Sequence, residues 1–371
     1  MSSRLKIVTV GPFPPLRGGI SDFHDSLVKQ LSKSSDVTVL NFKSLYPKIF
    51  FPGKSQYGSN QSSFKNVYTI LSPLNIISWI KGRFFLKKNN PDKLIVSYWN
   101  FFFIPLYIFL LGSVRKGNRY VLFHNVFSHE RKIFESFFLK YFLNKIDYCI
   151  VMNNHNKELI QTINSKVKII NNLHPIYDIP KSNTPNNIHK KDLKIEGKKT
   201  ILFFGLIREY KGLDLLIKSI QLSKEKVENL QVLVVGESYQ SLKPYHRMIK
   251  EFGIEDHFIF INRFIAKSNI EKYFLSSDLV VLPYKSASQS GILSLAYNFN
   301  RPVIVTDVGG LSEYVSNERS GFIVEPNPKN ISDKINIFFN SNLFSEMSNF
   351  IKDHKEKFSW KLFEKRLNLY E

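Results

Sequence analysis

Short apolar runs alternate with amphipathic stretches along most of the chain, beginning with the apolar run Leu5–Val10. Its continuous apolar character and its β-branched residues predict a buried strand of a parallel sheet. A turn-rich segment follows, and then Phe23, Leu27 and Leu31 recur four residues apart, which predicts a helix over Ile20–Leu31. Further strands are predicted at Val37–Leu40, Leu94–Ser97, Tyr120–Phe123 and Asp147–Met152. Strands separated by helical stretches indicate βαβ units.

The segment Pro175–Lys199 interrupts this rhythm, because it is rich in Pro, Asn, Lys and Ser and has no sustained apolar period. It predicts an interdomain linker with a hairpin-like excursion. Beyond it, strands are predicted at Thr200–Phe204, Val232–Val235, His257–Ile261, Leu279–Pro283, Val303–Thr306 and Phe322–Val324. Helices are predicted at Gly212–Leu222, at Asn269–Leu275, from about Ile292, and at Phe358–Phe363.

The alternation therefore predicts two doubly wound α/β domains, over residues 1–175 and 200–357, joined by a linker over 176–199 and followed by a helix over 358–371. A length of 371 residues agrees with two domains of ordinary size. Hydrophobic residues make up 43% of the chain, enough for two cores, which excludes general disorder. The single cysteine, Cys149, excludes a disulfide framework, and its apolar surroundings predict a buried thiol.

The first residues do not have the pattern of a signal peptide, and the most apolar stretch, Phe101–Leu111, is too short to span a bilayer and contains Pro105. We therefore expect a cytosolic protein, either soluble or lying on a membrane surface. The formal net charge is +21, and residues 1–175 hold 24 Lys and Arg against 8 Asp and Glu. Such asymmetry suggests an anionic membrane, a nucleic acid or an anionic substrate as the partner of the first domain. An A/T-rich genome, which favours Lys and Asn codons, explains part of the excess.

Doubly wound domains bind ligands at the carboxyl ends of their strands, so the loops there hold the candidate residues. Gly18 and Gly19 precede the first helix, where free backbone N–H groups can meet a phosphate or a sugar oxygen. They do not form the glycine pattern of a dinucleotide site. The pair His124 and Asn125 follows a strand, and His129 and Glu130 come shortly after. Such polar groups can bind a hydroxyl or a phosphate, and we find no third ligand that would make this a metal site.

Arg208 and Lys211 enter the second crevice between a strand end and a helix start, where two cations fit a diphosphate. The segment 286–291 is small and polar, and its Gln289, Ser290 and Gly291 suit sugar hydroxyls and phosphate oxygens. Three more residues of this half are predicted to bind the same ligand: Arg263, Phe264 and Glu313.

In order and spacing, these pieces resemble the GT-B fold glycosyltransferases of the retaining, nucleotide-sugar-dependent group known as family four, or group 1 glycosyl transferases. The similar pieces are Gly11-Pro12 to Gly18-Gly19, His124-Asn125 with His129-Glu130, Gly205 to Gly212, Ser277-Asp278, and Arg301-Pro302 to Glu313. The similarity covers nearly the whole chain. It implies two Rossmann-like domains that face each other across a cleft, and a last helix, around Trp360, that crosses back to the first domain.

The resemblance implies a first domain that binds the acceptor and a second domain that binds a UDP- or GDP-type sugar donor. Arg208 and Lys211 would neutralise the leaving diphosphate, so no metal or other cofactor is expected. Gly18 and Gly19 would touch the donor, and His124 would contact the transferred sugar. The residues of the acceptor side would be Asn125, His129 and Glu130. The implied reaction is sugar transfer to a glycan acceptor, lipid-linked, in bacterial surface polysaccharide synthesis at the inner face of the cytoplasmic membrane.

Two positions depart from the family's pattern. The family has two glutamates eight positions apart in its donor loop, and the corresponding positions here are Ala287 and Leu295. The family's basic pair has its arginine directly after the glycine, where this chain has Leu206 and places Arg208 two residues later. Because of these departures, the alternative function is a catalytically inactive protein of the same fold that binds nucleotide sugars or glycans.

Other function classes have less support. A nucleic-acid binder is suggested by charge alone, and no zinc finger or helix-turn-helix signature accompanies it. A nucleotide-sugar epimerase needs acidic crevice residues that cannot be placed in this sequence. Membrane contact is predicted for the aromatic segment Tyr98–Leu111, with a buried core helix as the alternative, and for the loop Lys48–Lys54.

Overall fold

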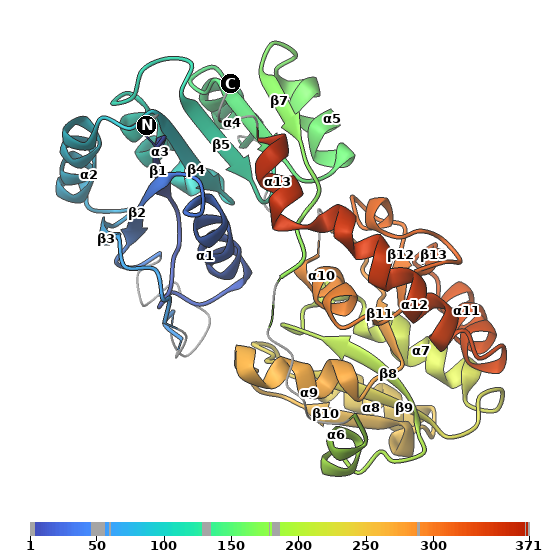
Figure 1. Ribbon diagram of the computed structural model, residues 1–371. Coiled ribbons are helices and arrows are strands. Elements are labelled where there is room, and N and C mark those ends of the chain that lie inside the picture. Colours follow the sequence, from blue (N-terminus) through green and yellow to red (C-terminus); the bar gives the residue numbers. More distant parts are fainter. Residues whose placement is uncertain are drawn as a thin grey trace. The chain divides into compact units, whose positions relative to one another are not determined.

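The computed structural model describes residues 4–45, 56–58, 61–127, 135–177, 179, 186–287, 290–367 and 369. The chain divides into two compact units (Figure 1). The first unit holds residues 1–175 and 358–371, and the second unit holds residues 176–357. Each unit has its own parallel β-sheet and its own apolar core.

The sheet of the first unit has seven strands in the order β3-β2-β1-β4-β5-β6-β7, with parallel pairing throughout. The strands are β1 (Lys6–Val10), β2 (Asp36–Phe42), β3 (Val67–Leu71), β4 (Lys93–Tyr98), β5 (Arg119–Phe123), β6 (Tyr148–Val151) and β7 (Lys168–Asn171). The central strands are buried on both faces, which explains their continuous apolar runs.

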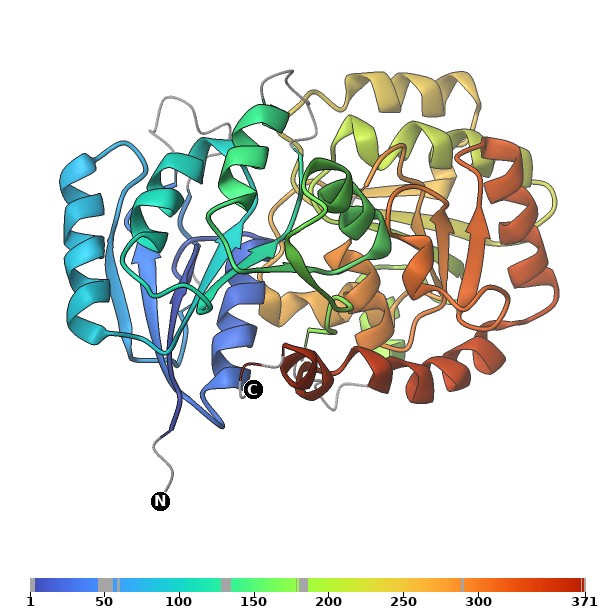
Figure 2. The same cartoon turned by 90° about the horizontal axis from the view of Figure 1, so that it is seen from above.

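Helices cover both faces of this sheet (Figure 2). Helix α1 and the last helix α13 pack together, while α2 to α5 lie side by side. Crossovers between parallel strands are right-handed, so helices lie on opposite faces of the sheet when the chain moves in opposite directions along it. The chain moves toward β3 through α1 and toward β7 through α2 to α5. The helices are α1 (Gly19–Leu31), α2 (Ile76–Asn89), η2 (Phe101–Phe103), α3 (Ile104–Leu111), α4 (Glu135–Leu143), α5 (Asn154–Ile163) and α13 (Trp360–Arg366).

The sheet of the second unit has six parallel strands in the order β10-β9-β8-β11-β12-β13. They are β8 (Lys199–Phe204), β9 (Leu230–Val235), β10 (Phe258–Ile261), β11 (Leu279–Leu282), β12 (Val303–Thr306) and β13 (Gly321–Val324). The α-helices are α6 (Asn186–Asp192), α7 (Leu213–Ser223), α8 (Lys243–Glu251), α9 (Ile270–Leu275), α10 (Gly291–Asn298), α11 (Pro328–Asn340) and α12 (Phe344–His354). The 3-10 helices are η3 (Glu209–Lys211), η4 (Glu255–His257), η5 (Lys267–Asn269), η6 (Ser312–Tyr314) and η7 (Lys355–Phe358).

The predicted α/β class with two parallel sheets is confirmed, and every predicted strand is present within two residues at either end. The sequence reading missed the edge strands β3 and β7, whose side chains are largely half-buried or exposed and so lack a buried apolar run. It also missed helices α2, α4, α5, α8, α11 and α12. Cys149 is buried in β6, as predicted, and burial raises the pKa of its thiol.

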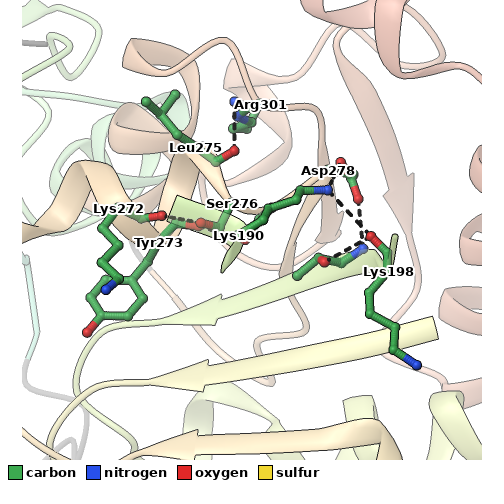
Figure 3. Close-up of polar contacts among 10 residues, drawn as sticks. Lys190, Lys198, Lys272, Tyr273, Leu275, Ser276, Asp278 and Arg301 are labelled. Carbon is green, nitrogen blue, oxygen red and sulfur yellow. Dashed lines mark hydrogen bonds and ion pairs between the residues drawn. The ribbon is translucent and has the colours of Figure 1, made fainter. Parts of the chain in front are cut away.

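The region 176–199 contains a helix, α6, where an irregular excursion was predicted. This helix is polar and is held by ion pairs, which is why it shows no apolar period. Lys190 lies 3.3 Å from the carboxylate of Asp278 (Figure 3). Asp192 lies 3.0 Å from Lys272 of α9. Asp278 also accepts a hydrogen bond from the backbone N–H of Thr200 at 2.7 Å, so it links α6 to the start of β8.

The predicted membrane contact over Tyr98–Leu111 is wrong. Tyr98 and Trp99 are buried, and α3 places most of its side chains in the core of the first unit, where Tyr107 donates a hydrogen bond to the carbonyl of Ser97 at 2.9 Å. The alternative, a buried core helix, is the one observed. The loop Lys48–Lys54 lies outside the described residues. Within the described part of the chain, no helix is both long and apolar enough to cross a bilayer.

Candidate functional site

The candidate residues of the second unit lie along one edge of its sheet. Arg208 and Lys211 follow β8, Ser290 and Gly291 follow β11, and Glu313 follows β12. These strands are consecutive in the sheet, so their carboxyl ends form one continuous edge, the place where doubly wound folds bind ligands.

The loop after β8 depends on two glycines with positive φ. A Cβ at Gly205 would lie 3.0 Å from the Nζ of Lys211, and a Cβ at Gly212 would lie 1.8 Å from the carbonyl oxygen of Pro283. Both positions therefore require glycine. The backbone of this loop approaches the end of β11 closely, and the ammonium of Lys211 folds back over the end of β8.

Lys211 is a buried cation, with 8% of its surface exposed. Its Nζ lies 5.6 Å from the ring centroid of Tyr284. Burial, and secondly the charge of Arg208, lower the pKa of Lys211 to about 8. No carboxylate among the described residues forms an ion pair with either cation. Two adjacent cations without an anion favour binding of an anionic ligand, because such a ligand relieves their repulsion and their desolvation.

Tyrosine side chains surround the loop that begins α10. The hydroxyl of Tyr284 lies 3.3 Å from the Oγ of Ser290, which also accepts the backbone N–H of Ile292. A Cβ at Gly291 would lie 3.2 Å from the ring of Tyr177. Sequence reasoning missed both tyrosines, although Tyr284 directly follows a predicted strand. Gln289 lies outside the described residues.

The remaining donor-side candidates are more peripheral. Arg263 and Phe264 follow β10, two strands from β8 at the edge of the sheet, and both are exposed. Glu313 lies half-buried in η6. Two pieces of the family pattern, Asp278 and Arg301, lie at the amino ends of β11 and β12, at the opposite edge, so they stabilise the fold. Burial lowers the pKa of Arg301 to about 10, and its guanidinium stacks 5.1 Å from Phe344 and donates to the carbonyl of Leu275.

In the first unit, Gly18 and Gly19 lie at the N-terminus of α1. Gly18 has φ 126°, a conformation that side chains rarely adopt. A Cβ at either glycine would meet no atom within 4 Å, so packing does not require glycine at position 19. The open space leaves room for a ligand beside the N-terminus of α1.

His124 follows β5 and lies against the same helix. Its ring meets Phe23 of α1 edge-on, 5.1 Å between centroids, and only 4% of the residue is exposed. Two histidines that sequence reasoning missed, His24 and His174, are buried nearby, and His174 also meets Phe23 at 5.1 Å. No signal in the sequence singled them out, since one lies within the predicted helix and the other beside Pro175.

Burial keeps all three imidazoles neutral. It lowers the pKa of His124 to about 3, with further lowering by His174 and His24, and it lowers the pKa of His24 and of His174 to about 4. The Nδ1 of His24 lies 3.0 Å from the carbonyl of Pro12, and because a carbonyl only accepts, this nitrogen carries the proton. Asn125 is half-buried beside His124, while His129 and Glu130 lie outside the described residues.

The departures from the family's glutamate pair have different surroundings. Leu295 lies on α10 with 7% of its surface exposed, so an apolar side chain fills the place of the second glutamate. Ala287 lies in the loop before α10. Among the residues that the structure describes, no three His, Cys, Asp or Glu side chains are placed to hold a metal ion.

Comparison with protein families gives a match over residues 185–357, to the family described as glycosyl transferases group 1. The matched residues all belong to the second unit. An uncharacterized glycosyltransferase of Methanocaldococcus jannaschii is 29% identical over 210 residues, which are 54% of this chain and 53% of that protein. A D-inositol 3-phosphate glycosyltransferase of Paenarthrobacter aurescens is 26% identical over 166 residues, 43% of this chain and 40% of that protein. The chain thus spans about half the length of the curated relatives it matches.

Solved structures extend the likeness beyond residues 185–357. Anabaena HepE in complex with UDP has a TM-score of 0.74 at 15% identity, with 98% of each chain covered. A glycosyltransferase of Rickettsia africae has a TM-score of 0.75 at 17% identity, with 99% of this chain and 98% of that chain covered. This likeness shows the fold, and the GT-B class expected from the resemblance is confirmed.

Proposed function

We propose that the chain is a retaining glycosyltransferase that moves a sugar from a UDP- or GDP-type nucleotide sugar to a glycan acceptor. The observation that carries this proposal is the pair Arg208 and Lys211, two cations without a carboxylate partner at the strand ends of the group 1 domain. HepE, which shares the fold, was crystallised with UDP and with UDP-glucose. A diphosphate matches the charge and the reach of this pair.

In the proposed reaction, Arg208 and Lys211 stabilise the charge that develops on the leaving diphosphate, so the reaction needs no metal ion or other cofactor. The bond between the anomeric carbon and the phosphate oxygen breaks, and the acceptor oxygen forms its bond on the same face of the sugar. The acceptor's proton passes to the departing phosphate oxygen. Further donor contacts are assigned to Gly18, Gly19, Arg263, Phe264, Gln289, Ser290, Gly291 and Glu313.

We assign acceptor binding to the first unit. His124 is neutral at physiological pH, so it can exchange hydrogen bonds with a sugar hydroxyl without adding charge. Asn125, His129 and Glu130 are its proposed neighbours on the acceptor side. The excess of positive charge in residues 1–175 supports a lipid-linked acceptor of bacterial surface polysaccharide synthesis, reached from an anionic membrane surface at the cytoplasmic side.

A second candidate function is a protein that binds nucleotide sugars without turning them over. The observation that favours it is the loss of both glutamates, at Ala287 and Leu295. Leu295 is buried and cannot contact a ribose through hydrogen bonds.

Turnover separates the two candidates. The protein is incubated with a panel of UDP- and GDP-sugars and a membrane extract of lipid-linked glycans, with EDTA present, and released nucleoside diphosphate and the glycan product are measured. Enzymatic transfer predicts product with the donor's anomeric configuration in EDTA. Binding of a nucleotide sugar without product on any acceptor supports the second candidate, and a product of inverted configuration contradicts the proposed mechanism.

A further inference from the structure

Helix α2 lies at the outer edge of the first unit (Figure 1). Exposed apolar side chains gather on this helix. Ile77, Ile80 and Phe84 are 65%, 55% and 69% exposed, and Leu74 and Ile76 at the start of the helix are exposed to a similar degree. Side chains of this size are seldom exposed together on a surface that meets only water.

The packing of α2 does not use these residues. The helix meets the sheet through Ser78, Gly82 and Leu86, which recur four residues apart and are buried. A Cβ at Gly82 would lie 2.8 Å from Leu71, so the approach is close. Ile80 and Phe84 lie on the opposite side of the helix, because two residues along an α-helix correspond to a turn of about 200°.

Two further contacts fix the orientation of α2. Trp79 and Arg83 face α3, where the guanidinium of Arg83 lies 5.0 Å from the ring centroid of Phe109 and donates to its carbonyl. On the other side, Phe85 packs against Tyr68 of β3 at 4.7 Å. The helix is therefore held on three sides, and its fourth side presents the apolar residues outward.

Cations and no anions accompany this apolar face. Lys81, Lys87 and Lys88 are exposed on α2. Between Asp36 and Asp92 the sequence has eight Lys and Arg and no Asp or Glu. A helix with apolar side chains flanked by lysines suits an anionic bilayer surface. The apolar side chains enter the headgroup region, and the lysines meet lipid phosphates.

Helix α4, in the same layer of helices, also exposes apolar side chains. Phe137 is 74% exposed, Phe138 and Tyr141 are also exposed, and Lys140 lies among them. Helix α3 lies between α2 and α4. Exposed apolar side chains are therefore not confined to one helix of this layer.

We propose that the outer face of α2, formed by Ile77, Ile80 and Phe84 with Lys87 and Lys88, docks the protein on an anionic lipid membrane. This rests on the membrane association proposed above and gives it a surface. A second copy of the chain is the less suitable occupant, because a two-fold interface would place this face against itself and bring like charges together. A lipid surface supplies the opposite charge.

Vesicle flotation tests the proposal. The probes are phosphatidylcholine vesicles with and without 30 mol% of phosphatidylglycerol, a fraction of roughly one third chosen to resemble an anionic leaflet. The test variant is Ile80→Asn with Phe84→Asn, and the matched control is Ile337→Asn, at an isoleucine 43% exposed on α11 of the second unit. We expect the wild type and the control to bind anionic vesicles alike, and the test variant to need at least about tenfold more lipid.

Charge is tested separately with Lys87→Ser and Lys88→Ser combined. Each lysine near an anionic surface strengthens binding about fivefold, so the pair is expected to weaken it about 30-fold on phosphatidylglycerol and little on phosphatidylcholine. All these positions are exposed, so the melting temperature and the release of nucleoside diphosphate from a nucleotide sugar are expected to stay unchanged.

The outcomes separate the claims. If the wild type binds no vesicles, membrane association itself is wrong, while turnover still decides the proposed function. If the wild type binds and the α2 variant binds equally well, this face is wrong. If the wild type is a dimer that the α2 variant converts to a monomer, without vesicle binding, the face belongs to a second copy and the proposal is overturned.

Discussion

Replacing Lys211 provides the sharpest perturbation of the proposed donor site. Lys211→Ala removes a buried ammonium that lies against Tyr284 and has no carboxylate partner among the described residues. Loss of one preorganised contact to charge that develops in a transition state costs about 10²–10³ in rate, so kcat/KM for the donor is expected to fall by that factor.

The pH profile adds a prediction that a structural role would not make. The pKa of Lys211 is lowered to about 8, mainly by burial. The ammonium form predominates below that pKa and is lost above it, so kcat/KM is expected to decline from about pH 8. Well above pH 8, the ammonium fraction and with it kcat/KM are expected to fall roughly tenfold for each further pH unit. Lys211→Arg should keep its charge and remove this decline. Arg208→Gln should lower the rate and shift the decline upward, because the charge of Arg208 also lowers the pKa of Lys211.

The assay is release of nucleoside diphosphate at subsaturating donor, from pH 6 to 10, with melting temperature as the folding control. Lys285→Ala is the matched control, since Lys285 follows the neighbouring strand β11 but forms an ion pair with Asp214 at 2.9 Å. It is expected to change the rate by a few-fold at most, since a partly exposed pair contributes about 1 kcal/mol or less. Unchanged kinetics for Lys211→Ala, or a wild-type profile that stays flat to pH 10, would refute the assignment of Lys211 to the donor diphosphate.

Two further predictions concern stability. The folded pKa values of His24, His124 and His174 are about 4, about 3 and about 4, below the unfolded value of 6.5, so the unfolded chain binds more protons than the folded one between these values. The free energy of unfolding should therefore be highest above pH 6.5 and decline toward pH 4, by up to about 1.4 kcal/mol per histidine per pH unit. His124→Gln should make this decline smaller in urea titrations, and an equal decline in the variant and the wild type would contradict the prediction. Gly212→Ala should lower the free energy of unfolding by roughly 3 kcal/mol or more, because the φ of +69° and a clash with a carbonyl oxygen both oppose a Cβ. Gly197→Ala, at φ +70° in open space, should lower it by only about 1 kcal/mol. Equal losses of stability in thermal unfolding would show that the clash at Gly212 is relieved without cost.

The buried strands and their carboxyl ends could be predicted because each strand is a continuous apolar run followed by a loop of glycines and charges. Lys211 was found in this way, since a cation directly beyond a buried strand of a doubly wound sheet points to the ligand edge. The burial of Lys211 could not be predicted, because it depends on glycines 205 and 212 that bring the loop against β11.

Helix α2 shows why other elements were missed. Its apolar residues lie on both the inner and the outer side, so the sequence has no single apolar stripe with a helical period. His24 and His174 were missed for a different reason. His174 meets Phe23 and His24 meets Phe13 only after the sheet has brought these distant segments together. Such clusters depend on long-range packing that local patterns do not contain.

The most direct measurement of the central claim is a crystal structure of the protein soaked with UDP and, separately, with GDP. The account predicts a nucleotide whose diphosphate oxygens lie within about 3.2 Å of the Lys211 Nζ and the Arg208 guanidinium, with no metal ion between them. A nucleotide bound elsewhere, or a diphosphate held through a metal ion, would contradict it.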